Sequence, residues 1–117
     1  MPGWEYVEAM QQRDKWKDHL LAVFDTHDVM LCPTTPMTAP MNGHHTAVLE
    51  GHRVDIGQAM VRYTAPWSLM DTPTLAVPAF SDSHGMPASI QIIGRPGDEA
   101  TVLRAGAIVE RIVAERY

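Results

Sequence analysis

The fold is decided by one continuous stretch, which reads Gly85-Met86-Pro87-Ala88-Ser89-Ile90-Gln91-Ile92-Ile93-Gly94-Arg95-Pro96-Gly97-Asp98-Glu99. Residues 88–93 are predicted to form a strand, since Ile90 and Ile92 alternate with Gln91 and Ile93. Residues 94–97 break that strand, and Asp98 is suited to cap a following helix. The helix has an apolar stripe formed by Val102, Ala105, Val109, Ile112 and Val113. We expect burial of Leu103, Val109 and Ile112 to stabilise it. A strand followed directly by an amphipathic helix indicates an α/β fold.

The rest of the chain supplies further short strands and helices. Apolar residues spaced by three or four predict an amphipathic helix over residues 5–24, with Trp16 in the core stripe. Two apolar runs bounded by proline, residues 29–32 and 74–77, predict buried strands. Residues 57–65 predict a short helix. Residues 37–56 are interrupted by glycine, proline and Asn42-Gly43, so we expect a flexible loop there.

The composition is that of a folded protein and excludes several classes of function. A chain of 117 residues with 45% hydrophobic and 20% charged residues is one unit, residues 1–117. Its net charge of -5 argues against nucleic-acid binding. No apolar run is long enough to predict a membrane span, and the N-terminus does not resemble a signal peptide, so we expect a cytoplasmic protein. The lone Cys32 lies in an apolar run and is expected to be a buried, inert thiol.

Other chemistry-bearing residues match no established pattern. His44, His45 and His52 do not follow a zinc spacing, so we expect solvated loop histidines and no metal or cofactor. Ser89 and His84 lack the glycine-rich elbow that presents a serine nucleophile. The two lysines, Lys15 and Lys17, are expected on the solvent side of the first helix.

Three motifs in the chain resemble those of the amidase-signature family, in the same order and at similar spacing. They are Asp28-Val29-Met30-Leu31-Cys32-Pro33-Thr34-Thr35-Pro36, the segment from Ser68 through Pro73 to Pro78, and Gly85 through Glu99. The resemblance spans about residues 13 to 110. It implies the C-terminal part of an α/β/α fold, with short strands of a mixed sheet packed by helices.

The resemblance also implies amide hydrolysis by a Ser–cis-Ser–Lys triad, but these residues match nothing in this chain. The 117 residues contain no Ser-Ser pair and no Gly-Ser cluster. Two further departures are Ser68 and Asp71, where the family has Asn and Gly. Because Asp tolerates the left-handed backbone region better than most residues, we expect the turn at Asp71 to be retained.

We therefore interpret the chain as a C-terminal segment of an amide hydrolase, inactive by itself, with no catalytic residue of its own. Such a segment would complete the sheet and part of the substrate channel. A small-molecule amide is then a substrate of the complete enzyme alone, and an upstream amidase part or self-association is the expected partnership. The pocket-lining candidates are Thr34, Thr35, Pro36 and Trp67. The alternative is a non-enzymatic interaction module derived from the amidase fold, and a third hypothesis, an independent small hydrolase, lacks a recognisable nucleophile.

Overall fold

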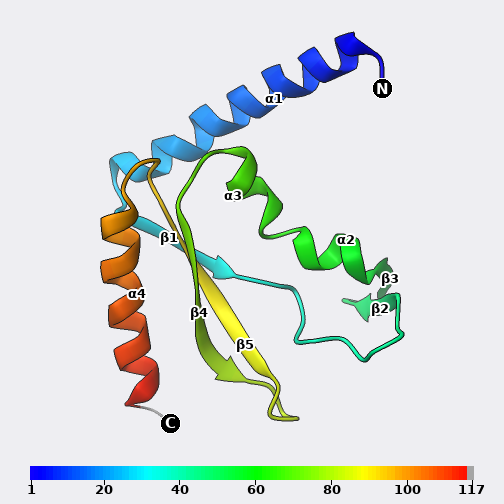
Figure 1. Cartoon of the computed structure of the whole chain (residues 1–117), viewed down its shortest axis with the longest axis vertical. Coiled ribbons are helices and arrows are strands. Elements are labelled where there is room, and N and C mark those ends of the chain that lie inside the picture. The colour runs from blue at the N-terminus through cyan, green and yellow to red at the C-terminus, as the bar shows by residue number, and fades with distance from the viewer. Residues whose placement is uncertain (116–117) are drawn as a thin grey trace.

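Strand β5 (Pro87–Gly94) is the centre of a three-stranded antiparallel sheet in the computed structural model, which describes residues 1–115 (Figure 1). It pairs on one side with β1 (Val29–Pro33) and on the other with β4 (Thr74–Ser81), so β1 and β4 are the sheet edges. The predicted strands are therefore present. Strand β4 continues four residues beyond the predicted end, past Pro78, with a register shift between Pro78 and Phe80.

Helix α4 (Glu99–Ala114) covers one face of this sheet (Figure 1). Val102 on its inner face packs with Val77 and Ile92, and all three are at most 3% exposed. Two glycines allow the close approach: a Cβ on Gly106 would lie 2.3 Å from Leu75 Cδ2, and one on Gly94 would lie 2.4 Å from Val102 Cγ2. The predicted stripe therefore faces the sheet at Val102, Ala105 and Val109. Burial of Leu103 and Ile112 was wrongly predicted, because both side chains lie outside the stripe that contacts the sheet and are exposed.

Asp98 caps α4 as predicted, since its carboxylate accepts a hydrogen bond from the Thr101 N–H at 3.3 Å. Arg95, three residues earlier, donates to the Phe24 carbonyl and lies 3.4 Å from the Asp25 carboxylate. These contacts join the β5–α4 connection to the chain segment that precedes β1.

Residues 46–55, predicted as loop, form a hairpin of two short strands, β2 (Thr46–Leu49) and β3 (His52–Asp55). The two-residue turn between them has a positive φ at both positions, 51° at Glu50 and 81° at Gly51. This is the backbone geometry that suits a tight hairpin. The prediction failed because Gly51 was interpreted as a breaker rather than as the second residue of such a turn.

Two short helices follow the hairpin, α2 (Ile56–Val61) and α3 (Ala65–Leu69). The hairpin itself is preceded by an exposed stretch, residues 39–46, which contains a turn closed by the His44 N–H and the Met41 carbonyl, 3.2 Å apart. After α3, Asp71 has a φ of 57°, so the aspartate does occupy the left-handed region as expected.

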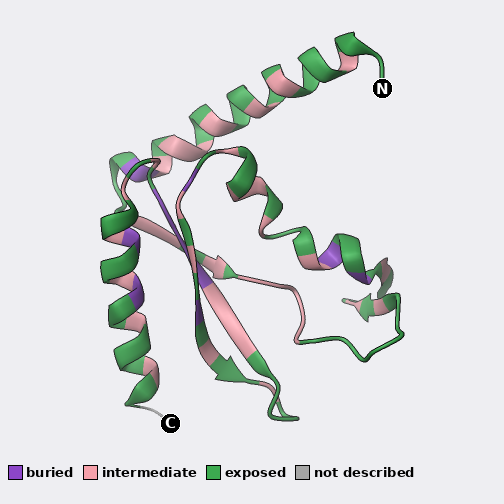
Figure 2. Cartoon of the chain, in the orientation of Figure 1, coloured by how far each residue is buried: buried purple, intermediate pink, exposed green. Residues whose placement is uncertain are grey.

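Helix α1 (Gly3–Leu21) and the 3-10 turn η1 (Ala22–Asp25) form the predicted first helix, but its burial differs from the prediction. No residue of α1 is buried, and Trp16, expected in the core, is 67% exposed (Figure 2). Lys17 is not on the solvent side, because its Nζ donates to the Asp71 carboxylate at 2.8 Å. This ion pair joins α1 to the turn before β4.

The chain as a whole is flat and extended rather than spherical. Its principal extents are 49 × 37 × 20 Å and its radius of gyration is 16.7 Å. A compact domain of this length has a radius of about 13 Å. None of the helices formed by residues 1–115 combines the length and apolar character needed to cross a bilayer.

Candidate functional site

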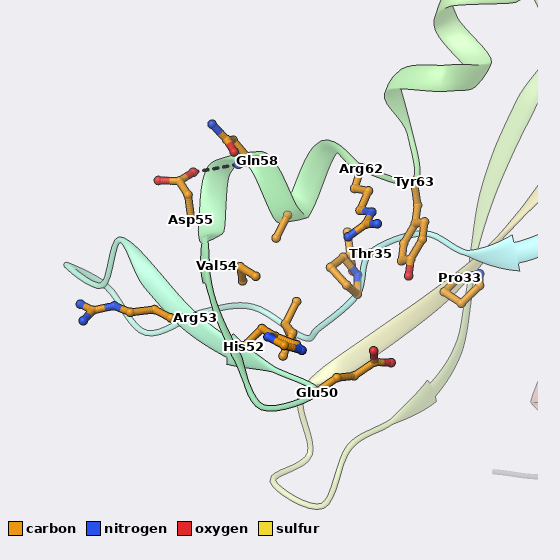
Figure 3. Close-up of a pocket in the computed structure, with 13 residues that line it drawn as sticks. Pro33, Thr35, Glu50, His52, Arg53, Val54, Asp55, Gln58, Arg62 and Tyr63 are labelled. Atoms are coloured by element: carbon orange, nitrogen blue, oxygen red, sulfur yellow. Dashed lines mark hydrogen bonds between the residues drawn. The ribbon is translucent and has the colours of Figure 1, made fainter.

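A pocket of about 840 Å³ opens between the end of β1, the β2–β3 hairpin and α2 (Figure 3). Arg62 and Tyr63, which follow α2, lie across this pocket from His52 and Glu50 of the hairpin (Figure 3). Pro33 lines it from the sheet side. The remaining lining residues are Thr35, Pro36, Leu49, Arg53, Val54, Asp55, Gln58 and Ala59.

The wall formed by residues 33–36 is fixed to β5 by hydrogen bonds. The Thr34 N–H donates to the Ser89 carbonyl at 3.1 Å, and the Ser89 hydroxyl donates to Thr34 Oγ1 at 2.9 Å. The Thr35 hydroxyl closes the following bend by donating to the Met37 carbonyl at 2.8 Å. The Thr34 and Thr35 hydroxyls are therefore both engaged in hydrogen bonds that hold this wall in place.

Two residues after this wall, the Thr38 hydroxyl donates to the Asp82 carboxylate at 2.8 Å. Asp82 also accepts from the Met86 and His84 N–H groups, at 2.9 and 2.8 Å, within the β4–β5 turn. The Met86 N–H, the Thr38 hydroxyl and the His84 N–H lower the pKa of Asp82, in that order of effect. The ionised carboxylate thus ties the wall to the tip of the β4–β5 hairpin.

The opposite wall carries charges of both signs. Asp55 caps α2 by accepting from the Gln58 N–H at 2.9 Å. Within residues 1–115, no ion pair joins Glu50, Arg53 or Arg62 to another side chain. Charged groups facing an open pocket without an ion partner are suited to contact a further polypeptide or a polar ligand.

The buried Gln91 side chain connects the end of β1 to the segment that follows α2. Its Nε2 donates to the Pro33 carbonyl at 3.1 Å and to the Tyr63 carbonyl at 2.6 Å, and it lies 3.1 Å from Cys32 Sγ. Gln91 is 1% exposed. Cys32, expected to be fully buried, is partly accessible at the edge strand.

The structure brings together two of the four predicted pocket residues. Thr35 and Pro36 line the pocket. Thr34 stands between two lining residues in the sequence but is not part of the lining, and its hydroxyl accepts a hydrogen bond from Ser89. Trp67 in α3 does not belong to this lining, and its indole N–H is buried with no acceptor among residues 1–115. A role for these four in substrate binding remains a prediction. The hairpin residues Glu50, His52 and Asp55 were missed because the hairpin was missed.

The pocket does not assemble a recognisable nucleophile and base. The Ser89 hydroxyl donates to Thr34 rather than to His84, whose own segment is the β4–β5 turn. Within the described residues, no three His, Cys, Asp or Glu side chains gather closely enough to hold a metal ion.

Comparison with known proteins identifies the fold to which these elements belong. A family model described as Amidase matches residues 3–103. The chain belongs to the amidase signature family. Its motif Gly85–Glu99, which forms β5, the following turn and the start of α4, is thus an amidase element as the resemblance implied.

Curated relatives of this amidase-family chain are much longer than it is. It is 34% identical to a fatty acid amide hydrolase of Medicago truncatula, over 95% of this chain and 18% of the relative. It is 32% identical to the 1-carboxybiuret hydrolase subunit AtzE of Pseudomonas sp. (strain ADP), over 90% of this chain and 23% of the relative. The chain therefore spans about a fifth of the length of these relatives.

This chain also covers only about a quarter of the length of the solved structures that it matches. A crystal structure of an amidase superimposes with a TM-score of 0.91 and 30% identity, covering 97% of this chain and 26% of that one. A vestigial protein complex bearing on the origins of an s-triazine catabolic enzyme matches with a TM-score of 0.88 and 31% identity, covering 96% and 25%. The sheet and helices described above are thus a partial amidase fold.

Proposed function

We propose that this chain is the C-terminal portion of an amidase-signature amide hydrolase, which completes the sheet and forms part of the substrate channel. The nucleophile and its activating serine and lysine would come from the rest of the enzyme. The substrate would be a small-molecule amide, and the complete enzyme would act in the cytoplasm. The chain alone would not hydrolyse amides.

The observation that carries this proposal is the incomplete burial of the chain. Seven hydrophobic residues among residues 1–115 are buried, whereas sixteen large hydrophobic side chains are exposed. The radius of gyration of 16.7 Å exceeds the value of about 13 Å for a compact domain of this length. Exposed apolar surface on this scale indicates surfaces that a further polypeptide covers.

Two local features support the same proposal. Both outer strands of the sheet, β1 and β4, have free edges, which favour pairing with additional strands. The Trp67 indole N–H is buried without an acceptor among the described residues, although buried donors in complete folds are almost always paired. An acceptor from the remaining part of the domain would satisfy it.

The first experiment is light-scattering mass measurement, coupled to chromatography, on the purified 117-residue chain, with an assay on aryl and aliphatic amides. We expect a dimer or larger species, or a partly structured chain, and no turnover above background. A compact monomer with a sharp thermal transition would favour the alternative, an autonomous interaction module. Turnover that Ser89→Ala abolishes and the matched Ser83→Ala retains would contradict the proposal altogether.

A further inference from the structure

Gln91 stands out because it is the one buried residue of β5 with a polar side chain, between Ile90 and Ile92. Its carboxamide nitrogen has two hydrogens and three acceptors within reach: the Pro33 and Tyr63 carbonyls at 3.1 and 2.6 Å, and Cys32 Sγ, a weaker acceptor, at 3.1 Å. Hydrogen bonds require a fixed donor–acceptor geometry, so a buried amide whose N–H groups are bonded fixes the positions of its partners as well as stabilising the fold.

The two carbonyl acceptors belong to segments that are far apart in the sequence but lie side by side at the pocket. Pro33 ends β1 and begins the wall of residues 33–36, Tyr63 follows α2 and lies beside Pro33, and the hairpin residues His52 and Glu50 lie across from Tyr63 (Figure 3). Among the described residues, the Gln91–Tyr63 bond is the single hydrogen bond that joins residues 42–64 to the three-stranded sheet. This carboxamide is therefore the polar link between the sheet and the segment that carries the hairpin and α2.

We propose that Gln91 is a positioning residue of the pocket, which holds the Tyr63 backbone beside the end of β1 and so places α2 and the hairpin relative to the wall of residues 33–36. In a complete amidase this placement would shape the substrate channel. That last step rests on the proposed function, whereas the link between Tyr63 and the end of β1 does not.

The chemistry of the site explains why a glutamine suits this position. The nitrogen faces two carbonyl oxygens and the Cys32 sulfur, which are all acceptors, so the side chain at this position must donate hydrogen bonds and must not be a carboxylate. A carboxylate of the same shape would instead place negative oxygen atoms against two carbonyl oxygens. An apolar side chain would leave both carbonyls without their donor, which is costly where water is excluded.

The first test is hydrogen exchange on the full chain carrying Gln91→Met, which keeps the side-chain length and removes both donors. The reporters are the Arg62 and Thr64 amides, which bond to the Ala59 and Val61 carbonyls, and the Gly94 amide, which bonds to the Pro73 carbonyl in the sheet region. We expect exchange at Arg62 and Thr64 to accelerate about tenfold, with Gly94 little changed, because the loss is local.

The matched control is Ile92→Val, on the neighbouring strand position that faces α4. It should accelerate Gly94 at least as much as Arg62 and Thr64. If Gln91→Met accelerates all three amides alike, Gln91 is an ordinary core residue and the proposal is wrong. The proposal also fails if Arg62 and Thr64 are unprotected in the unsubstituted chain, or if Gln91→Met leaves them unchanged.

A second test uses Gln91→Glu and a pH titration of the same amides. Burial beside two carbonyl oxygens should raise the pKa of the introduced carboxyl above its unfolded value. Its protonated form donates one hydrogen bond, so protection at Thr64 should be greatest at low pH and fall as pH rises through the folded-state pKa. A pH-independent ratio to the unsubstituted chain would contradict the proposal. Neither test depends on amidase activity, so failure here is separate from failure of the proposed function.

Discussion

The two long helices of this chain differ in how they are held. Helix α4 begins with a side-chain cap at Asp98 and buries Val102 and Gly106 against the sheet. Helix α1 has no side-chain cap and no buried residue, and its tryptophan Trp16 is 67% exposed. Both were recognised from apolar spacing. Spacing alone thus identifies a helix, but burial of its apolar face requires a partner surface, which the described residues supply for α4 and not for α1.

The largest expected effect comes from removing the residue on which α4 packs. Ile92→Ala deletes a side chain that is 0% exposed, so the free energy of unfolding should fall by about 2–5 kcal/mol. Urea unfolding followed by circular dichroism measures it. The matched change Leu103→Ala, on the exposed face of α4, should stay within about 0.5 kcal/mol of the parent. Equal losses from the two would mean that α4 is not held by its sheet face.

The next effect concerns the start of α4. Asp98→Ala removes the acceptor of the Thr101 N–H, so the melting temperature should fall, by less than for Ile92→Ala. Asp98→Asn retains a side-chain oxygen and should restore most of the loss. Thermal melts of the three chains check this, and an equally large loss in Asp98→Asn would count against capping as the cause.

A smaller effect should separate α1 from the rest of the chain. Hydrogen bonding from Lys17, followed by the Lys17 charge, lowers the pKa of Asp71 from its ordinary value of 3.8. Because the folded-state pKa is depressed, the stabilisation is present above that ordinary value and is lost as pH falls through the folded-state pKa. Asp71→Asn should reduce the loss of stability below pH 3.8, to which Asp82 and Asp98 also contribute, and should loosen α1, as measured by melts on either side of pH 3.8.

The control for that ion pair lies within α1 itself. Asp14→Asn removes the contact between Arg13 and Asp14, 2.7 Å apart, and leaves the Lys17–Asp71 link intact. The melting temperature of Asp14→Asn should fall on acidification as much as that of the parent chain. A smaller fall in Asp14→Asn but not in Asp71→Asn would show that Asp71 does not anchor α1.

The smallest expected effect on stability is at Trp16. Trp16→Ala should change the free energy of unfolding by no more than about 0.5 kcal/mol, because the side chain is mostly in solvent. It should weaken self-association in light scattering, since an exposed tryptophan favours contact with another polypeptide. A loss of stability comparable to that of Ile92→Ala would place a partner for α1 within this chain.

The elements that the sequence predicted well are those that a short local pattern determines. Strand β5 and the Asp98 cap follow from alternation and from one capping residue, and both are confirmed. The β2–β3 hairpin was missed because Gly51 was interpreted as a breaker, and because the other turn residue is a glutamate at a positive φ, which Glu seldom adopts. The link through Gln91 depends on Tyr63, 28 residues away, so local pattern does not reveal it.

The exposed stretch before the hairpin has a practical consequence. Thr38 is fixed to Asp82 at one end and Thr46 enters β2 at the other, while residues 39–46 are exposed throughout. Within it, Gly43 has a φ of 81° and open space around the position of a Cβ. A peptide tag or a protease site inserted between Asn42 and Gly43 would thus leave both flanking attachments in place, which makes this turn the natural point at which to open or label the chain.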